Sequence, residues 1–557
     1  MVRPTLVYGL IAGAFVFVAG SAMAAAPLTG KGSSPAVAVA AATPSPEPIR
    51  LFLPEDLPAE IAELLRRGVG SLALSPGQRP VVSAPSPSEA TAVLMLRPAG
   101  DAGNPAVLAQ TTYAVVVPFA TVTDEITAAE LKARWQGAGQ GRLLVSPAVA
   151  AALAPVLGPP AATVQLSTDL LHDLQSMPGT VGILPFPQID PRYKVLAIDG
   201  MNPLSNQFRP GGYPLYVEWM LVGRDGVELA RQLPGALPIT NRDPRRLTTL
   251  VMTGVTAMSR MTADRMEKKG VTYPAAVIGP VLRSADITHV SNEVPFIKGC
   301  KVNTSSSSLR FCSDPKYRAA LAEIGTDIVG LSGNHVNDFG RKGALESLAL
   351  YKDNSIPVYG SGLNEHEACA PLLLEHNGQK LVFLAALAYQ PSSAWATPTE
   401  PGACHYDSNE AAILRSISDL KASGHIVAVE LQFYESYKPS PTSRQVAVFR
   451  RLRDAGADIV TGVQSHVPQA MEPYGQADRG GSGMIVYGLG NLFFDQMWSW
   501  PTRTGLIARH TIYDGRLLNT EILTTVLMDY AQPRWATTKE RAEILQRIFK
   551  GAPPRSE

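Results

Sequence analysis

Apolar stretches of strand length alternate with helical patterns along most of this 557-residue chain, and this alternation restricts its fold more than any other feature. In the C-terminal half, strands are predicted at Thr249–Val255, Asp286–Ser291 and Thr326–Leu331, with helical patterns between them. Such alternation favours an α/β fold whose sheet edge carries the functional site. Further predicted elements are helices at Ser259–Lys269, Pro315–Ile324, Lys342–Asp353 and Thr442–Ala455, and strands at Lys380–Leu387, Ile426–Phe433, Asp458–Val463 and Met484–Gly488.

A second α/β region is predicted upstream. Its helix at Thr127–Gln136 has Thr127 as cap and Glu130 as the capping-box partner. Its predicted strands are Ala92–Leu96, Tyr113–Phe119, Val181–Phe186 and Lys194–Asp199. The polar stretch Asn241–Arg246 is a natural linker. The predicted segments are 1–24 signal or anchor, 25–48 flexible linker, 49–236 first domain, 237–247 linker, 248–530 second domain and 531–557 tail with a short helix.

The first residues have the pattern of an export signal. Arg3 precedes an apolar run from Leu6 to Ala19, and Ala22-Met23-Ala24 supplies a small-x-small cleavage site. An uncleaved membrane anchor is the alternative, because the run to Ala26 is just long enough to span a bilayer. Either way, we expect the body of the protein to lie outside the cytoplasm.

Four cysteines fit an extracytoplasmic chain. Disulfides form in oxidising compartments, and four cysteines allow three connectivities. Sequence proximity favours the pairs Cys300–Cys312 and Cys369–Cys404. No two of these cysteines have the spacing of a zinc knuckle, so a cysteine metal site is disfavoured.

The overall charge argues against nucleic-acid binding. The chain has a formal net charge of +1, with 45% hydrophobic and 17% charged residues. It has no basic run interleaved with aromatic residues, which is the usual electrostatic footprint of a nucleic-acid interface.

Polar residues follow the predicted strands. Asn334 and His335 come directly after the strand Thr326–Leu331, and an amide beside an imidazole at a strand end is typical of a metal-dependent hydrolase. The competing interpretation is a structural turn with a surface histidine. The other strand-end phrases are Thr253–Arg260, Ser291–Pro295, Gln432–Tyr434, Gly462–Val467 and Tyr487–Gln496.

In their order, these phrases resemble the capsule-synthesis family CapA, whose domain has the calcineurin-like metallophosphatase fold. The family's phrases run G-D-x-M-L-x-R, N-L-E-x-P, N-N-H-x-x-D-x-G, H-W-G-x-E, G-H-H-P-H-V and S-L-G-N-F-V-F-D-Q. The resemblance implies an exported protein of poly-γ-glutamate capsule synthesis and a two-metal centre that activates a bridging water.

This chain departs from the family pattern at several ligand positions. Glu293, Asn334 and His466 are retained as implied metal ligands. Val255 replaces the aspartate of the first phrase, and Gln432 and Gln464 replace two histidines. Amide oxygens bind transition metals more weakly than imidazoles do. We therefore expect a degraded centre in which a divalent metal, Mn²⁺ or Mg²⁺, binds weakly or not at all.

The resemblance also implies supporting roles. His335 is the candidate acid–base residue, and the alternative is a histidine that only hydrogen-bonds in a vestigial site. Glu293 without a cation is expected to have a raised pKa unless a base pairs with it, and Arg260 is the candidate base. Asp338 is expected to fasten its loop. Asn491 and Asp495 belong to the last phrase.

The first domain resembles the phosphate-type periplasmic binding proteins in the order of the phrases YAVVVPF, DEITAAELKARWQG, GTVGILPF and KVLAIDG. We find no phosphate cradle there, and a domain that merely spaces or docks is the alternative. Three functions follow. The first is an exported protein of cell-envelope or capsule polymer synthesis, attachment or recognition, with poly-γ-glutamate as the implied polymer and that polymer or a small anionic ligand as its partner. The second is an active metal-dependent hydrolase of an envelope phosphoester or amide, and the third is a solute-binding or sensory scaffold.

Overall fold

The computed structural model describes residues 47–54, 59–73, 79–98, 104, 106–233, 237–305, 307–475 and 483–554. The predicted signal segment 1–24 and nearly all of the predicted linker 25–48 lie outside the described residues. Residues 48–557 form one compact unit, so the predicted division into two domains at 237–247 stays a prediction.

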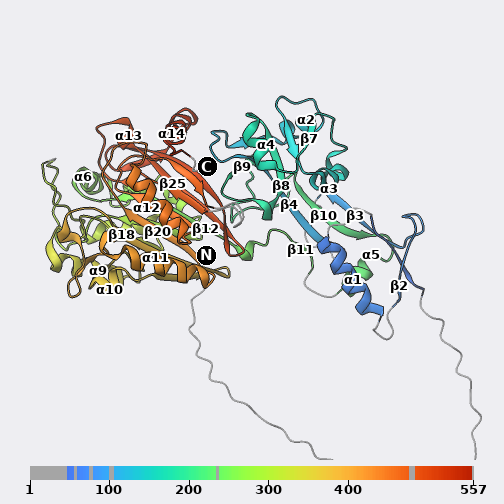
Figure 1. Ribbon diagram of the computed structural model, residues 1–557, viewed down its shortest axis with the longest axis horizontal. Helices are drawn as coiled ribbons and strands as arrows, with labels where there is room; N and C mark the ends of the chain where they lie inside the picture. Colours follow the sequence, from blue (N-terminus) through green and yellow to red (C-terminus); the bar gives the residue numbers. More distant parts are fainter. Residues whose placement is uncertain are drawn as a thin grey trace, which may run out of the picture. The chain divides into compact units, whose positions relative to one another are not determined.

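The upstream region is built on one mixed sheet (Figure 1). In the described ranges its strands run in the order β2-β1-β3-β10-β4-β8-β6-β7, with β9 and β11 also paired to β4 and β5 paired to β9. The strands are β1 (Ile49–Phe52), β2 (Val81–Ser83), β3 (Ala92–Pro98), β4 (Val107–Pro118), β5 (Glu125–Ile126), β6 (Leu143–Val145), β7 (Val164–Leu166), β8 (Val181–Pro185), β9 (Tyr193–Ile198), β10 (Tyr216–Val222) and β11 (Ile239–Thr240). The helices are α1 (Ala59–Ala73), α2 (Ala128–Trp135), α3 (Pro147–Leu157), α4 (Leu170–Ser176) and α5 (Gly226–Gln232).

Helix α2 begins as its sequence predicts, with one difference. The Thr127 side chain accepts a hydrogen bond from the backbone N–H of Glu130 at 3.0 Å, which is the expected N-cap. The Glu130 carboxylate does not complete the predicted capping box and instead bonds Arg134 at 2.6 Å, one helical turn away.

The downstream region is a sandwich of two sheets. Within the described residues, the first sheet has the order β15-β14-β13-β12-β25-β26-β27 with β24 beside β12, and the second has the order β17-β18-β20-β21-β23-β22. The first contains β12 (Leu247–Thr256), β13 (Ile287–Asn292), β14 (Ile328–Gly330), β15 (Val358–Tyr359), β24 (Asn491–Phe493), β25 (Thr504–Tyr513), β26 (Arg516–Met528) and β27 (Gln532–Trp535). The second contains β17 (Leu372–His376), β18 (Gln379–Leu387), β20 (Ile426–Gln432), β21 (Ile459–Val463), β22 (Met471–Tyr474) and β23 (Gly483–Val486), and the short pair β16 (Ser361–Gly362) and β19 (Gly402–Ala403) lies apart from both.

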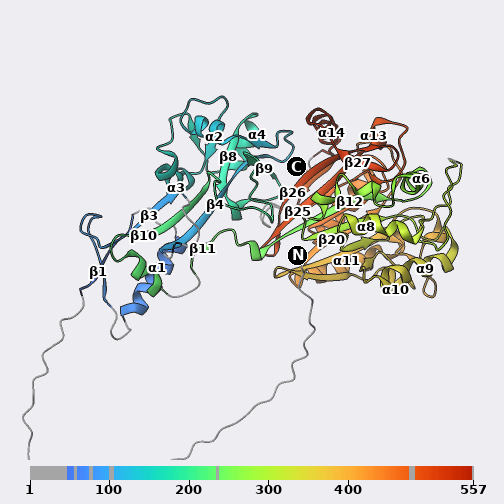
Figure 2. The ribbon, with the colours of Figure 1, turned by 180° about the vertical axis from the view of Figure 1, so that it is seen from behind.

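Helices cover the outer faces of this sandwich. An apolar core that includes Met252, Phe383 and Ile459 fills the space between the sheets. Helices α11 and α12 lie in front of the second sheet in Figure 1, and α8 lies in front of β12 in Figure 2. The helices are α6 (Arg260–Lys269), α7 (Gly279–Leu282), α8 (Arg318–Glu323), α9 (Gly340–Asp353), α10 (Glu365–Ala368), α11 (Tyr406–Ala422), α12 (Ser443–Asp454), α13 (Trp500–Arg503) and α14 (Thr538–Lys550). The predicted α/β fold class is confirmed.

The two regions share a buried core. Leu247, Tyr513 and Leu518 of the sandwich pack with Phe186 and Tyr193 of the upstream sheet. The stretch predicted as a linker also contributes, since β11 pairs with β4 and the buried Arg242 donates to the carbonyl oxygens of Pro203 and Ser205, each at 2.6 Å. The stretch is therefore packed into the unit.

Both predicted disulfides are formed. Cys300–Cys312 closes the loop after β13, and Cys369–Cys404 ties the end of α10 to the start of α11. Each bridge links near neighbours in sequence, as proximity suggested.

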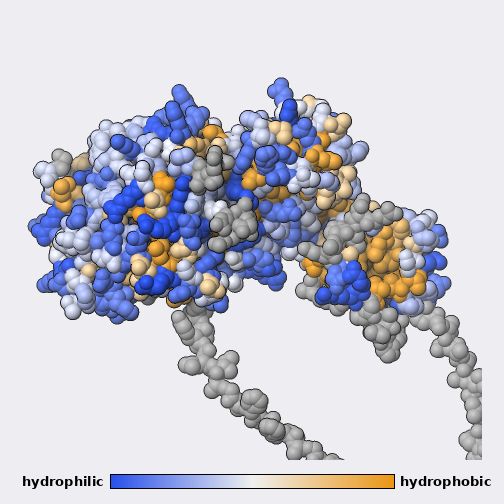
Figure 3. Space-filling view, viewed as in Figure 1, coloured by the Kyte–Doolittle hydropathy of each residue, from blue (hydrophilic) through white to orange (hydrophobic). Residues whose placement is uncertain are grey.

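Figure 3 shows apolar residues gathered on the surface around α1 and β2. Leu53 and Val82 are exposed there, beside the partly buried Val81. None of the helices in the described ranges has the length and apolar character needed to cross a membrane.

Candidate functional site

The predicted site residues meet at one edge of the sandwich. Strands β12, β13 and β14 run parallel in the first sheet, and β20 and β21 run parallel in the second. Their carboxyl ends therefore lie at the same edge. The residues placed at or just beyond these ends are Val255, Glu293, Asn334, His335, Gln432, Gln464 and His466.

A chain of side-chain amides joins the two sheets. Gln432 Nε2 donates to Asn334 Oδ1 at 3.2 Å and to Gln464 Oε1, and Gln464 Nε2 donates to Glu435 Oε1 at 3.3 Å. The amides of Asn334, Gln432 and Gln464 are buried. Because buried amides are costly to leave unpaired, this network fixes the loops after β14, β20 and β21 relative to one another.

Glu293 is an almost fully enclosed carboxylate of the site. Its side chain is 2% exposed and its Oε1 lies 3.5 Å from His335 Nε2. Its Oε2 atom has no hydrogen-bond partner in the described part of the chain. Burial raises the pKa of Glu293, while the neighbouring His335 and His466 act in the opposite direction.

His335 lies between two carboxylates. Its Nδ1 atom is 2.7 Å from Asp338 Oδ2, and its ring centroid is 4.4 Å from that of Phe311. Burial lowers the pKa of His335, but the hydrogen bond to Asp338 and the charge of Glu293 outweigh this and leave the pKa raised. Asp338 also accepts from the backbone N–H of Phe311 at 2.7 Å, so it holds the disulfide-closed loop against the histidine.

His466 occupies the second half of the site. Its Nδ1 atom is 2.9 Å from Asn491 Oδ1, and its Nε2 atom is 3.5 Å from Glu435 Oε1. The hydrogen bond with His466 lowers the pKa of Glu435. The Tyr437 ring stacks on His466 with centroids 5.5 Å apart.

The backbone around this histidine is unusual. Gln464, His466 and Tyr437 have φ angles of 83°, 54° and 51°, in the left-handed region that side chains rarely adopt. Such outliers concentrate at functional sites, where surrounding contacts hold them in place.

Arg260 does not pair with Glu293, which corrects the predicted pairing. Its guanidinium bonds Asp495 Oδ1 and lies over the rings of Phe311 and Phe494, at 4.9 Å and 5.0 Å from their centroids. The pairing fails because the retained aspartate of the last phrase, Asp495, faces the start of α6.

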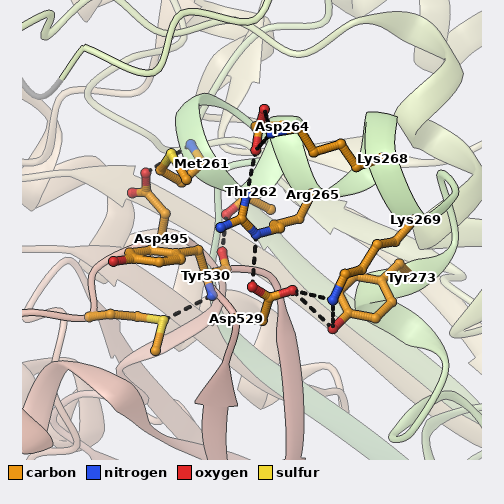
Figure 4. A network of polar contacts seen from close by, with 11 residues as sticks. Met261, Thr262, Asp264, Arg265, Lys268, Lys269, Tyr273, Asp495, Asp529 and Tyr530 are labelled. Carbon is orange, nitrogen blue, oxygen red and sulfur yellow. Dashed lines mark hydrogen bonds and ion pairs between the residues drawn. The ribbon is translucent and has the colours of Figure 1, made fainter.

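Further hydrogen bonds hold helix α6 along its length. Asp495 accepts from the backbone N–H of Met261 at 3.1 Å, and Figure 4 shows Asp529 between Arg265 and Lys269. Arg265 Nε and Lys269 Nζ donate to Asp529 at 2.8 Å and 2.6 Å. This network therefore holds α6, and Arg260 at its first position, against the turn that follows β26.

The resemblance to the CapA family implies a two-metal centre, and the donor set of this site does not fit one. Val255 supplies no ligand atom. The oxygens of Asn334 and Gln464 already accept hydrogen bonds from Gln432, so an amide N–H group lies between the atoms that would have to face a cation. Within the described ranges, no three His, Cys, Asp or Glu side chains are arranged to hold a metal ion. Among the described residues of the site, the unpartnered Oε2 of Glu293 is an atom that suits a cation.

Sequence reasoning missed Glu435, Tyr437 and Phe311. Glu435 follows the end of β20 by three residues, so a carboxylate just beyond a strand end was the available signal. The positions of Tyr437 and Phe311 depend on an irregular loop and on a disulfide-closed loop, and neither follows from strand periodicity.

The segment that carries this site is similar to known proteins. Residues 249–496 match the family model described as "Bacterial capsule synthesis protein PGA_cap". The "Capsule biosynthesis protein CapA" of Bacillus anthracis is 27% identical over 284 residues, which cover 50% of this chain and 67% of the relative. Through this segment the chain is similar to the CapA proteins. The "PGA biosynthesis protein CapA" of Bacillus subtilis (strain 168) is 24% identical over 259 residues, covering 46% of this chain and 66% of the relative. The match thus spans about two thirds of the length of both CapA relatives.

The region upstream of the CapA segment has a weaker likeness. The crystal structure of an ABC-type phosphate transport receptor from Vibrio cholerae aligns with 34% of this chain and 93% of its own length, at 13% identity and a TM-score of 0.26. A likeness at this level carries no argument, so the resemblance to binding proteins stays a prediction.

Proposed function

We propose that this protein acts outside the cytoplasm in the synthesis, attachment or recognition of an envelope polymer of the poly-γ-glutamate type. The single observation that carries the proposal is the match of residues 249–496 to the capsule-synthesis family. The names of the Bacillus relatives support the polymer class, and the two disulfides agree with an oxidising compartment.

We further propose that the sheet-edge site works without a two-metal centre. Gln432 and Gln464 use their amides to bind each other, Asn334 and Glu435, which leaves few oxygens for a cation. Any residual divalent ion, Mn²⁺ or Mg²⁺, would bind weakly and through Glu293.

What remains is a site for hydrogen bonding. Glu293 can accept a hydrogen bond from a ligand through its free Oε2, and protonated His335 can donate one through Nε2 when Glu293 does not take it. Both suit the N–H and C=O groups of an amide-linked polymer. His335 is accordingly the residue we propose for any acid–base role, with Asp338 holding its ring.

The proposed function is tested in the native cell. An in-frame deletion is expected to reduce the cell-bound polymer strongly, measured as glutamate released by acid hydrolysis of washed envelopes. Wild-type protein and the surface control Lys380→Gln are expected to restore it, whereas Glu293→Ala/His335→Ala is not. Unchanged polymer in the deletion strain would contradict the proposal.

The alternative of an active metal-dependent hydrolase predicts something different. Purified protein supplied with Mn²⁺ would then hydrolyse a phosphodiester, and His466→Ala would abolish the reaction. The third possibility, a solute-binding scaffold, is addressed by ligand-dependent shifts in unfolding temperature, because a ligand that binds only the folded state raises the apparent stability.

A further inference from the structure

A cavity of about 830 Å³ lies away from the sheet-edge site. One wall is β9 with the loop that follows it, and the other is β26 with helix α14. The walls are tied together by contacts across the cavity: Asn519 Nδ2 donates to the Tyr193 carbonyl at 2.8 Å, and the rings of Phe119 and Phe549 meet edge to face with centroids 5.8 Å apart. A volume of this size is typical of small-molecule sites.

The polar part of the lining is a cluster in which cations outnumber carboxylates. Lys194 Nζ lies 2.7 Å from Asp124 Oδ1, and Arg541 bonds the same carboxylate at 2.5 Å and 2.7 Å. Asp124 is thus shared by two cations, and their bonds lower its pKa against the effect of burial. Arg509 pairs with Glu521 at 2.6 Å.

Basic residues also outnumber acidic residues over the whole lining of the cavity. It contains four basic and three acidic residues, and it has no histidine. The remaining cation, Arg209, has no carboxylate partner among the described residues, since its one hydrogen bond goes to the Phe208 carbonyl. The cations Lys194 and Arg541 are largely enclosed, with 17% of each side chain exposed. Lys194 also donates to the carbonyl oxygens of Thr121 and Val122, and Arg541 donates to that of Ile522. Their attraction for an anion therefore comes from their partly desolvated positive charge, which a single carboxylate only half neutralises.

The rest of the lining suits short aliphatic and amide groups. Phe119, Leu545 and Trp535 provide apolar surface, and Asn202 and Thr520 provide hydrogen-bonding side chains beside it. A ligand that fits must combine a carboxylate with methylene and amide groups. A γ-glutamyl unit has this composition, because each residue carries one α-carboxylate, two side-chain methylenes and one amide.

We propose that this cavity is a binding site for a short γ-glutamyl chain, whose carboxylates bind the basic side chains of the lining, Lys194, Arg541 and Arg209. The choice of a γ-glutamyl chain as the ligand rests on the proposed function. The cavity and its excess of basic residues are observed independently of that function. The residues that line the cavity lie outside the family segment 249–496. The segment and the cavity nevertheless belong to one folded unit.

Calorimetric titration of the purified protein with tri-γ-glutamate tests the proposal. Inorganic phosphate and the trimer analogue in which all four carboxylates are primary amides are titrated in parallel. The wild-type protein is expected to bind tri-γ-glutamate, to bind the amidated trimer at least about tenfold more weakly, and to bind phosphate weakly. Filling the cavity by Gln207→Trp is expected to weaken binding without touching the charged cluster.

Opposite charge changes in the cluster separate binding from structure. Lys194→Gln removes a cation and is expected to weaken binding about tenfold. Asp124→Asn removes the competing carboxylate and is expected to tighten binding about threefold, since the positive charges of Lys194 and Arg541 are then not neutralised by it. Lys380→Gln, an exposed position outside the cavity, is the matched control and is expected to leave binding unchanged.

A merely structural cluster would respond in another way, because Lys194→Gln and Asp124→Asn would then weaken binding alike. That result, or no binding of tri-γ-glutamate to the wild-type protein, would overturn the proposal. Phosphate binding without binding of the trimer would also contradict it. If the deletion strain still loses its polymer while the trimer does not bind, only the inference about the cavity is wrong; if neither holds, the proposed function is wrong as well.

Discussion

The Nε2 atom of Gln432 lies 3.2 Å from Oδ1 of Asn334, and this contact joins the second sheet of the sandwich to the first. Replacing Gln432 with methionine keeps the volume but leaves the amide oxygens of Asn334 and Gln464 without their donor. We expect the free energy of unfolding to fall by about 1–3 kcal/mol, measured by urea denaturation. The exposed Gln175→Met is the control, and equal stability of the two variants would contradict the role of the amide chain.

The Arg260–Asp495 pair gives a second prediction. Both side chains are largely buried, so Arg260→Ala leaves an uncompensated carboxylate and is expected to destabilise the protein by about 3 kcal/mol. The double variant Arg260→Met/Asp495→Leu is expected to recover much of this loss. Arg245→Ala, at a highly exposed arginine, should leave the stability nearly unchanged. The losses of stability in Arg260→Ala and Asp495→Ala should add up to more than the loss in the double alanine variant. A sum equal to the loss in the double variant would argue against a pair.

The two disulfides are expected to contribute unequally to stability. Cys369–Cys404 closes a segment of 35 residues and Cys300–Cys312 one of 12, and a longer closed loop restricts the unfolded chain more. Double serine variants should therefore lose about 3–4 kcal/mol and about 2–3 kcal/mol, respectively. The shorter bridge also holds Phe311 against His335, so its loss alone should alter the NMR signals of that histidine. Unchanged His335 signals would contradict this positioning.

His510 makes the stability depend on pH. Burial, together with the nearby His289, lowers the pKa of His510 from 6.5 to about 3. The unfolded chain therefore binds a proton on this histidine between about pH 6.5 and pH 3 and the folded protein does not, so stability is lost as the pH falls through this range. The loss between pH 7 and pH 5 should be about 2 kcal/mol smaller in His510→Gln than in the wild type, measured by urea denaturation at both values. An identical pH dependence of the two proteins would exclude the effect.

Part of this architecture was accessible from the sequence. Glu293, Asn334 and His466 come together because each directly follows a parallel strand, and strand periodicity predicts those strands well. The strands β25 and β26 were missed, although their connection carries the two-residue turn Asp514-Gly515, which is a strong hairpin signal.

Other features depend on contacts that no local pattern reveals. Arg260 and Asp495 are 235 residues apart, and the choice of Asp495 over Glu293 as the partner of Arg260 is made by the packing of α6. Glu435 reaches His466 only because the loop after β20 turns back through Tyr437, whose φ angle is 51°. The cation cluster at Lys194 and Arg541 likewise forms only when the upstream sheet and α14 meet.

Metal content tests the central claim, that the sheet-edge site retains its position in a CapA fold while its two-metal centre is lost. The wild type and the triple variant Val255→Asp/Gln432→His/Gln464→His are dialysed against Mn²⁺, then against metal-free buffer, and analysed by mass spectrometry. We expect well under one bound Mn²⁺ per wild-type chain and clearly more bound Mn²⁺ per chain of the triple variant. Near two Mn²⁺ per wild-type chain, lost in His466→Ala, would contradict it.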